Sequence, residues 1–230
     1  MKFTISRDAL LKPLNLVAGV VERRQTLPIL ANVLMVLEGD RLSLTGTDLE
    51  VELVGRVQLA GAGDSGEVTV PARKLVDICK SLPEGSDIQF AMQDNKVTVK
   101  SGRSRFTLST LPSREFPNVE DSLGTHQFKV KQGQLKRLID RTAFAMAQQD
   151  VRYYLNGMFW EIKDGQLRVV ATDGHRLAMC TLPSKIDADG DTQVILPRKG
   201  VLELGRLLTD EDGDISIVIG SNHVRATTAG

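Results

Sequence analysis

The sequence predicts an α+β protein built from two copies of one unit. Each copy shows a short alternating strand, an amphipathic helix, several alternating strands, a second helix and further strands. Strands that follow one another between two helices are typical of antiparallel sheets in the α+β class. An internal repeat supports the two copies, because pairs of like residues lie 125 positions apart: Leu30 and Leu155, Leu42 and Leu167, Thr47 and Thr172, Asp48 and Asp173.

The first copy is predicted to cover residues 1–122. Ser6 is a candidate N-cap for the first helix, Pro13 should kink that helix, and Pro71 begins the second. A linker rich in Pro, Ser and acidic residues is expected over 112–124. The inner helix faces are predicted from apolar spacing to be Leu10, Leu14 and Val17, then Leu75, Ile78, Cys79 and Leu82. Strands are expected at residues 3–5, 29–37, from 41, 49–53, 68–70, 88–92, 97–100 and 103–109.

The second copy is predicted to cover residues 126–230. It begins with an alternating strand at residues 127–130, and further strands are expected at 215–219 and 223–228. No counterpart of the first linker follows, so we expect this second domain to be incomplete at its C-terminus. The inner faces of its two helices are predicted to be Leu135, Leu138, Ile139, Thr142 and Met146, then Val201, Leu204 and Leu208.

Charge is balanced overall but unevenly distributed. The chain has 29 basic and 29 acidic side chains, which argues against a general nucleic-acid binder. The four helical segments (7–18, 71–81, 131–147 and 197–208) nevertheless carry net charges of +1, +2, +3 and +2, so the rest of the chain is negative. If the helices line one side of the sheets, that side attracts a polyanion. A basic surface helix with no function is the alternative for any single helix.

Other features point to a protein of the cytosol. There is no apolar run of membrane-spanning length and no signal peptide. Cys79 and Cys180 form no CxxC pattern, and the three histidines are scattered, so neither a disulfide framework nor a metal or other cofactor is expected.

Several ordered motifs resemble one family. They are KFTISRDALLKPL, TLPILANVLM, LSLTGTDLE, VPARKL, SGRSRFTLSTLP, QDVRYYLNGM, ATDGHRLA and PRKGVLEL. Together they are similar to the sliding clamp, the beta subunit of bacterial DNA polymerase III. The resemblance implies a homodimeric ring in which helices line the hole and antiparallel sheets form the outside. It also implies a non-catalytic processivity factor in DNA replication, and a third clamp domain that this sequence lacks.

The resemblance implies contacts with double-stranded DNA, independent of its sequence, by Arg24, Arg73, Gln149, Tyr153 and Tyr154. Guanidinium groups suit phosphates, and tyrosine rings can stack on bases or donate to phosphate. Packing at the edge of a hairpin is the alternative for the two tyrosines.

A partner-peptide groove is also implied by the resemblance, for the polymerase III core, the clamp loader and other proteins with a clamp-binding motif. The second domain would contribute Leu155, Thr172, Gly174, His175, Arg176 and Leu177. The other half would come from the third domain.

A ring interface is implied at Lys74, Arg103, Arg105, Phe106 and Leu108. The alternating strand 103–109 suits an edge that awaits a partner strand, although an interior strand is the alternative. Without a third domain we expect a monomer or an irregular associate.

Two other functions compete with the clamp. An enzyme could use Asp173 and His175, but the sequence has no phosphate-binding Gly-Lys-Ser/Thr loop or nucleophile motif, and Asp-Gly is first of all a turn. A peptide-binding scaffold that never meets DNA is the second alternative.

Overall fold

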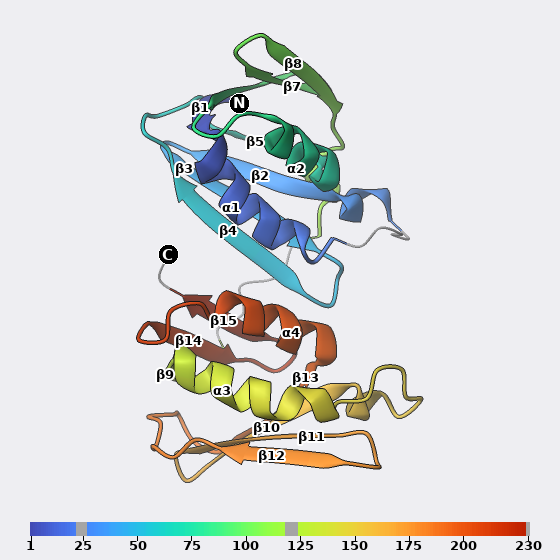
Figure 1. The fold of residues 1–230 in the computed structure, drawn as a ribbon, viewed down its shortest axis with the longest axis vertical. Coiled ribbons are helices and arrows are strands. Elements are labelled where there is room, and N and C mark those ends of the chain that lie inside the picture. Colours follow the sequence, from blue (N-terminus) through green and yellow to red (C-terminus); the bar gives the residue numbers. More distant parts are fainter. Residues whose placement is uncertain (22–26, 118–123, 229–230) are drawn as a thin grey trace. The chain divides into compact units, whose positions relative to one another are not determined.

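A computed structural model describes residues 1–21, 27–117 and 124–228. It divides into two compact units, Met1–Val119 and Glu120–Gly230, and each is described by itself. Both units have two helices packed against antiparallel sheets (Figure 1). No helix within the described ranges is long and apolar enough to cross a membrane.

Unit 1 contains two four-stranded sheets, with strand orders β1-β6-β7-β8 and β4-β3-β2-β5. Every neighbouring pair is antiparallel. The strands are β1 Lys2–Ser6, β2 Asn32–Glu38, β3 Arg41–Thr47, β4 Glu52–Gln58, β5 Gly66–Pro71, β6 Asp87–Gln93, β7 Lys96–Ser101 and β8 Ser104–Ser109. The helices are α1 Arg7–Ala18 and α2 Ala72–Ser81, with short 3-10 turns η1 Pro28–Ala31 and η2 Ser113–Glu115.

Unit 2 repeats this arrangement over its described residues. Its sheets have the orders β12-β11-β10-β13 and β15-β14-β9, again antiparallel throughout. The strands are β9 His126–Lys131, β10 Gly157–Lys163, β11 Gln166–Thr172, β12 Leu177–Thr181, β13 Thr192–Pro197, β14 Asp214–Ile219 and β15 Val224–Thr228. The helices are α3 Gln132–Thr142 and α4 Arg198–Leu207, with 3-10 turns η3 Ala143–Ala145 and η4 Tyr153–Leu155.

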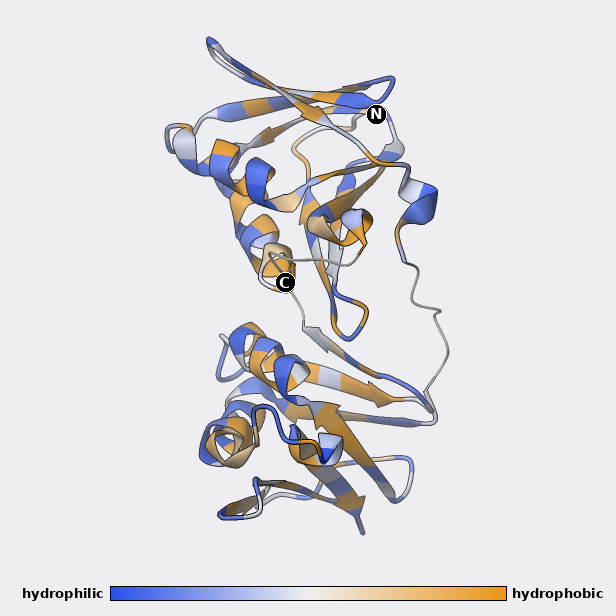
Figure 2. Cartoon of the chain, turned by 90° about the vertical axis from the view of Figure 1, so that its right-hand side faces the viewer, coloured by the Kyte–Doolittle hydropathy of each residue, from blue (hydrophilic) through white to orange (hydrophobic). Residues whose placement is uncertain are grey.

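The helices form where the sequence predicts them. The Ser6 hydroxyl accepts a hydrogen bond from the Ala9 amide at 3.2 Å and so caps α1, although Pro13 lies inside this helix. All the apolar residues predicted for the four inner helix faces are buried. In Figure 2 the strands of both units carry hydrophobic residues interleaved with hydrophilic ones, the pattern of a sheet with one face on the core.

Helix α1 lies directly on the backbone of unit 1. A Cβ atom added at Gly46 would lie 2.5 Å from the Val17 carbonyl oxygen, and one at Gly55 would lie 2.7 Å from Pro13 Cβ. These two glycines on β3 and β4 therefore allow a closer approach than any other residue would.

Unit 2 has a core of its own. Trp160 is its largest side chain, lies in the middle of β10 and is 1% exposed. Phe128, Leu135 and Ile215 also line this core, and they come from β9, α3 and β14. The indole N–H of Trp160 is buried, and no hydrogen-bond partner for it is found among the described residues.

Three predictions about unit 1 are wrong in detail. The strand expected from residue 29 begins at Asn32, because Pro28 starts a 3-10 turn. The strand expected at 49–53 begins only at Glu52. The first part of the expected linker 112–124 packs on unit 1, since Phe116 is buried against Ile29 and Leu30.

Candidate functional site

The loop before β10 is a closed structure that presents aromatic residues to solvent. The Ala147 amide donates to the Leu155 carbonyl at 3.0 Å, which joins the two ends of the loop. Inside it, the Asp150 amide donates to Asn156 Oδ1 at 2.9 Å, and Asn156 Nδ2 donates to the Asp150 carbonyl at 2.8 Å. The backbone of the loop is therefore fixed by its own polar groups.

The predicted DNA-contact residues of unit 2 lie at the outer side of this loop. Gln149 is exposed, Tyr153 is 83% exposed and Tyr154 is 49% exposed. The two tyrosine rings meet edge to face with centroids 5.8 Å apart. Both rings belong to η4 and not to a strand edge, so the packing alternative for them is wrong.

An ion pair that no pattern of residues indicated fixes the tip of the loop. Arg152 Nε and Nη2 donate to the two carboxylate oxygens of Asp150 at 2.9 and 2.8 Å. The Arg152 amide also donates to Asp150 Oδ1 at 2.8 Å. The Arg152 side chain, then its amide, lower the pKa of Asp150 to about 2.

We expect this loop to loosen in acid. The pKa of Asp150 in the folded chain lies below its value in an unfolded chain, which is about 3.9. The ion pair therefore stabilises the loop fully above about pH 4, and this stabilisation is lost as the pH falls towards 2. NMR of the Tyr153 and Tyr154 rings should show this transition. In Asp150→Asn the rings should already be mobile at neutral pH and show no such titration. A transition retained in Asp150→Asn would contradict this assignment.

The turn between β11 and β12 carries most of the predicted groove residues. Thr172 Oγ1 accepts from the Gly174 amide at 3.1 Å and donates to the Arg176 carbonyl at 2.7 Å. Asp173 Oδ1 accepts from the amides of His175 and Arg176 at 2.9 and 3.0 Å. The hydrogen bonds donated by these two backbone amides, that of His175 first, lower the pKa of Asp173 below its usual value. The carboxylate is thus engaged in shaping a turn, and no dyad with His175 is formed.

Unit 1 builds the same turn from the repeated Thr-Asp pair. Thr47 Oγ1 accepts from the Leu49 amide at 3.1 Å, and Asp48 Oδ1 accepts from the amides of Glu50 and Val51 at 3.0 and 2.8 Å. Leu49 therefore takes the place of Gly174 and has φ of +78°, close to the +89° of Gly174. This left-handed residue explains why the strand expected at 49–53 begins late.

Gly174→Ala should destabilise unit 2 by about 1–2 kcal/mol, the cost of a side chain in this left-handed conformation. The added methyl group would also lie 3.3 Å from Arg152 Nη2 and so disturb the loop. Urea unfolding followed by the fluorescence of Trp160, the only tryptophan, reports on unit 2.

The matched variant for this turn is Leu49→Gly, which relieves the same conformation in unit 1 and should stabilise that unit. Equal stability of the Gly174→Ala variant and the parent chain would contradict the prediction.

One arginine connects the loop to the turn, and a second connects the turn to η3. The Arg152 guanidinium lies against Gly174, and Arg176 Nη2 donates to the Phe144 carbonyl at 2.7 Å while its guanidinium lies 5.6 Å from the centre of the Phe144 ring. Leu155 is half-buried where the loop meets β10, and Leu177 is exposed at the start of β12. The structure thus brings the predicted groove residues of unit 2 into one region beside the tyrosines.

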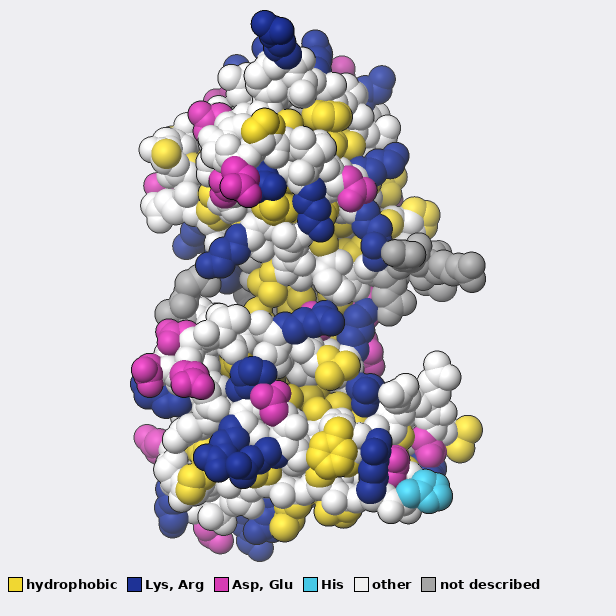
Figure 3. Space-filling model, in the orientation of Figure 1, with side chains coloured by type: hydrophobic (Ala, Val, Ile, Leu, Met, Phe, Trp, Pro, Cys, Tyr) yellow, Lys and Arg dark blue, Asp and Glu magenta, His cyan; other side chains and the backbone are white. Residues whose placement is uncertain are grey.

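The helices of each unit lie on one side of its sheets and carry basic side chains. Figure 3 shows Lys and Arg groups, interspersed with Asp and Glu, over the helices of each unit. Arg73 is exposed in the first turn of α2, and its Nη2 donates to the Val21 carbonyl at 3.1 Å. Arg24 lies outside the described residues. The exposed basic residues of these helices include Lys12, Arg73, Lys74, Lys80, Arg137, Arg141 and Arg206.

Four of the five residues predicted for a ring interface lie on an edge strand or in the turn before it. Among the described residues β8 has only β7 as a neighbour in its sheet, so the interior-strand alternative is wrong. Arg105 is exposed on β8, Arg103 is exposed in the preceding turn, and Phe106 is half-buried. Lys74 is exposed on α2, whereas Leu108 is buried in the unit 1 core.

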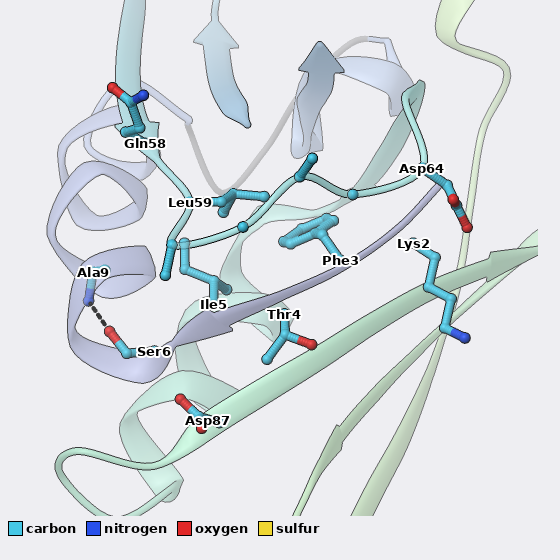
Figure 4. A pocket seen from close by; sticks show the side chains of 14 residues that line it. Lys2, Phe3, Thr4, Ile5, Ser6, Ala9, Gln58, Leu59, Asp64 and Asp87 are labelled. Atoms are coloured by element: carbon cyan, nitrogen blue, oxygen red, sulfur yellow. Dashed lines mark hydrogen bonds between the residues drawn. The ribbon is translucent and has the colours of Figure 1, made fainter. Parts of the chain in front are cut away.

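A cleft of about 660 Å³ lies elsewhere, between β1 and the segment Gln58–Asp64 (Figure 4). Its floor is apolar, with Phe3, Ile5 and Leu59, and Asp64 and Asp87 lie at its rim. None of the predicted site residues that the structure describes lines it. Among the described residues, no three His, Cys, Asp or Glu side chains are grouped as a metal site would require.

Comparisons with known proteins agree over both units. Residues 1–120 match the family model of the DNA polymerase III beta subunit, N-terminal domain, and residues 129–230 match that of its central domain. The beta sliding clamps of Pseudomonas aeruginosa and Escherichia coli are 66% and 52% identical over 99% and 98% of this chain. In both cases the chain spans 62% of the length of the relative.

Solved structures give the same result. The crystal structure of the DNA polymerase III subunit beta from P. aeruginosa superposes with a TM-score of 0.95 at 64% identity, over 99% of this chain and 62% of that one. A Caulobacter crescentus beta sliding clamp superposes with a TM-score of 0.91 at 40% identity, over 100% of this chain and 62% of that one. The chain therefore belongs to the family of the DNA polymerase III beta subunit, the bacterial beta sliding clamps.

Proposed function

We propose that this chain is part of a DNA sliding clamp, which encloses duplex DNA and holds the replicative polymerase on it without catalysing a reaction itself. The observation that carries this proposal is the match to beta sliding clamps across both units, in sequence and in fold. The first domain is proposed to comprise residues 1–122 and the second 126–230, and the intact ring is proposed to be a homodimer. Its place would be on the DNA in the bacterial cytoplasm.

DNA contact is assigned to the helical sides and to the loop before β10. Arg24 and Arg73 would bind phosphates, and Gln149, Tyr153 and Tyr154 would bind phosphate or stack on an exposed base. Movable basic groups that contact only phosphates are compatible with sliding, because they do not depend on base sequence. The exposure of both tyrosine rings supports this role.

Partner binding is assigned to Leu155 and the turn Thr172–Leu177. An apolar residue at each end, with polar groups between them, suits a short peptide that carries an apolar motif. The polymerase III core, the clamp loader and other proteins with a clamp-binding motif are the proposed partners. In the intact ring, the edge strand β8 with Lys74 and Arg103 would pair with a neighbouring chain.

The test is association with linear duplex DNA, measured by fluorescence anisotropy with two unrelated sequences. We expect weak binding that is equal for both and falls steeply between about 50 and 200 mM salt, because released counterions drive it. Binding that depends on sequence would contradict the proposal. A peptide-binding scaffold would be favoured instead if no association occurred at the lowest salt concentration.

A further inference from the structure

The strand β1 has a free edge over most of its length. On one side it pairs with β6 along Lys2–Ser6. On the other side, its only partner in the described part of the chain is Asp64, whose amide and carbonyl exchange hydrogen bonds of 2.8 and 3.1 Å with Lys2. Because the backbone groups of a strand point alternately to its two sides, the N–H and C=O of Thr4 point to the side of Asp64, away from β6.

The residues at the two ends of β1 support this direction. The Met1 carbonyl accepts from the Met92 amide at 3.0 Å, on the side of β6. The Arg7 amide donates to the Ser86 carbonyl at 2.8 Å, again on that side. Neither backbone group of Thr4 has a hydrogen-bond partner among the described residues, and Thr4 is exposed. Unpaired backbone groups at the edge of a sheet can accept a further strand.

The cleft beside β1 has room for a short strand at this edge (Figure 4). Its opposite wall includes residues 60–62, Ala-Gly-Ala, which are exposed and too small to fill it. One residue of an extended strand occupies about 160 Å³, from a rise of about 3.3 Å and spacings of about 4.8 and 10 Å to its neighbours. The cleft volume of about 660 Å³ therefore corresponds to about four residues. The unpaired part of β1, residues 3–6, has the same length.

The two ends of the cleft differ in charge. Asp64 and Lys2 lie together at one end, so their charges offset each other (Figure 4). Asp87 lies at the other end, opposite Ser6 in the pairing of β1 with β6. It is exposed, and no ion pair of its carboxylate is found among the described residues. A residue of an added strand opposite Ser6 would lie on the same face of the sheet, about 10 Å from Asp87, which a lysine or arginine side chain can span.

We propose that the edge of β1 binds an extended peptide segment of a partner protein by strand addition, with a lysine or arginine of the segment opposite Ser6 and beside Asp87. The segment runs antiparallel to β1 and covers residues 3–6, since Asp64 already occupies the place opposite Lys2. Its residue opposite Thr4 exchanges two hydrogen bonds with the free N–H and C=O. The residues on either side of that one face the apolar floor at Phe3 and Ile5, so they are apolar.

This surface is separate from the proposed clamp contacts and does not depend on them. The probe is the capped peptide Lys-Val-Thr-Val, which has the proposed pattern, titrated into the ¹⁵N-labelled chain and followed by NMR. We expect the Thr4 amide resonance to move saturably and its exchange with water to slow, because the amide becomes hydrogen-bonded. The Ile88 amide, which belongs to β6 on the other side of β1, should stay unchanged.

Two altered peptides separate the contributions of the backbone and of the charge. Methylation of the threonine nitrogen removes the donor to the Thr4 carbonyl and should abolish binding at the same concentration. Replacing the lysine by glutamate should weaken binding about fivefold, the upper end for an exposed ion pair. In Asp87→Asn the lysine and glutamate peptides should bind equally. The charge assignment falls if they bind the parent chain equally.

A variant of the chain tests the edge itself. Thr4→Pro removes only an N–H that faces the cleft, so β1 should stay paired with β6 and peptide binding should be lost. Protection of the Ile88 amide shows whether the pairing is kept. Binding to this variant with Ile88 still protected would overturn the proposal, as would an unmoved Thr4 amide at millimolar peptide or an equal response to the methylated peptide. Movement of the Thr4 amide with protein concentration alone would identify a second copy of the chain as the occupant instead.

Discussion

Trp160→Ala should destabilise unit 2 by about 3–5 kcal/mol, the range for removing a buried aromatic side chain. The side chain is 1% exposed and lies at the centre of the cluster that joins β9, β10, β14 and the helices of this unit. Because a domain has only about 5–15 kcal/mol of stability, unit 2 should then unfold at much lower urea concentration. Unit 1 has separate core residues and should keep its stability.

The measurement is hydrogen exchange with mass spectrometry at increasing urea, which follows peptides of each unit separately. Trp160→Phe is the matched control, since it keeps an aromatic ring and removes the buried N–H that has no partner among the described residues. Its loss of stability should be much smaller than that of Trp160→Ala. If unit 1 and unit 2 lost protection together, the two units would not be independent in stability.

Reversing the charge at both Arg24 and Arg73 should weaken association with duplex DNA by roughly 50-fold at 0.1 M salt. Each phosphate contact raises the binding constant at 0.1 M salt by a factor of nearly ten relative to its value at 1 M salt, and two contacts would be lost. The slope of the logarithm of the binding constant against that of the salt concentration should fall by about 2 in magnitude. This result rests on the proposed clamp function. Anisotropy titrations at several salt concentrations provide both numbers.

The control for this double variant changes the net charge equally at another place. Lys96 and Lys100 are exposed on β7, on the face opposite to the buried Val97 and Val99. Reversing both lysines should reduce DNA affinity much less, since they lie on a sheet and not on the helical side. Equal losses in the two variants would mean that only the net charge of the chain matters, and would remove Arg24 and Arg73 from the proposed contacts.

Periodic features of the sequence predicted the fold well. Apolar spacing identified the buried faces of all four helices, because helix amphipathicity depends on local sequence alone. The alternation of apolar and acidic residues gave a wrong prediction at Leu49, because the pattern Leu-Glu-Val-Glu-Leu is typical of a strand. The side chains of Thr47 and Asp48 bind the following amides and form a turn instead. Local hydrogen bonds of this kind compete with the strand ladder and leave no mark on hydropathy.

The candidate site was predicted only in part. The resemblance supplied Tyr153, Tyr154 and the turn at Gly174, but nothing in the residue pattern pointed to the ion pair between Asp150 and Arg152. That pair depends on a loop whose ends are joined by the amide of Ala147 and the carbonyl of Leu155. Contacts made by a fixed loop conformation become visible only in three dimensions, since short spacing between opposite charges is common on any surface.

The pairing of β1 with β6 determines the order in which the chain can fold during synthesis. Phe3 lies opposite Phe90, so β1 is synthesised well before the strand with which it pairs. In the same way, β9 is synthesised well before its partner β14, in which Ile217 lies opposite Phe128. Because domains fold as they are made, unit 1 can complete its sheet before β9 has a partner. In refolding from denaturant both strands are available at once, so we expect mispairing between the two units to be more frequent than during synthesis.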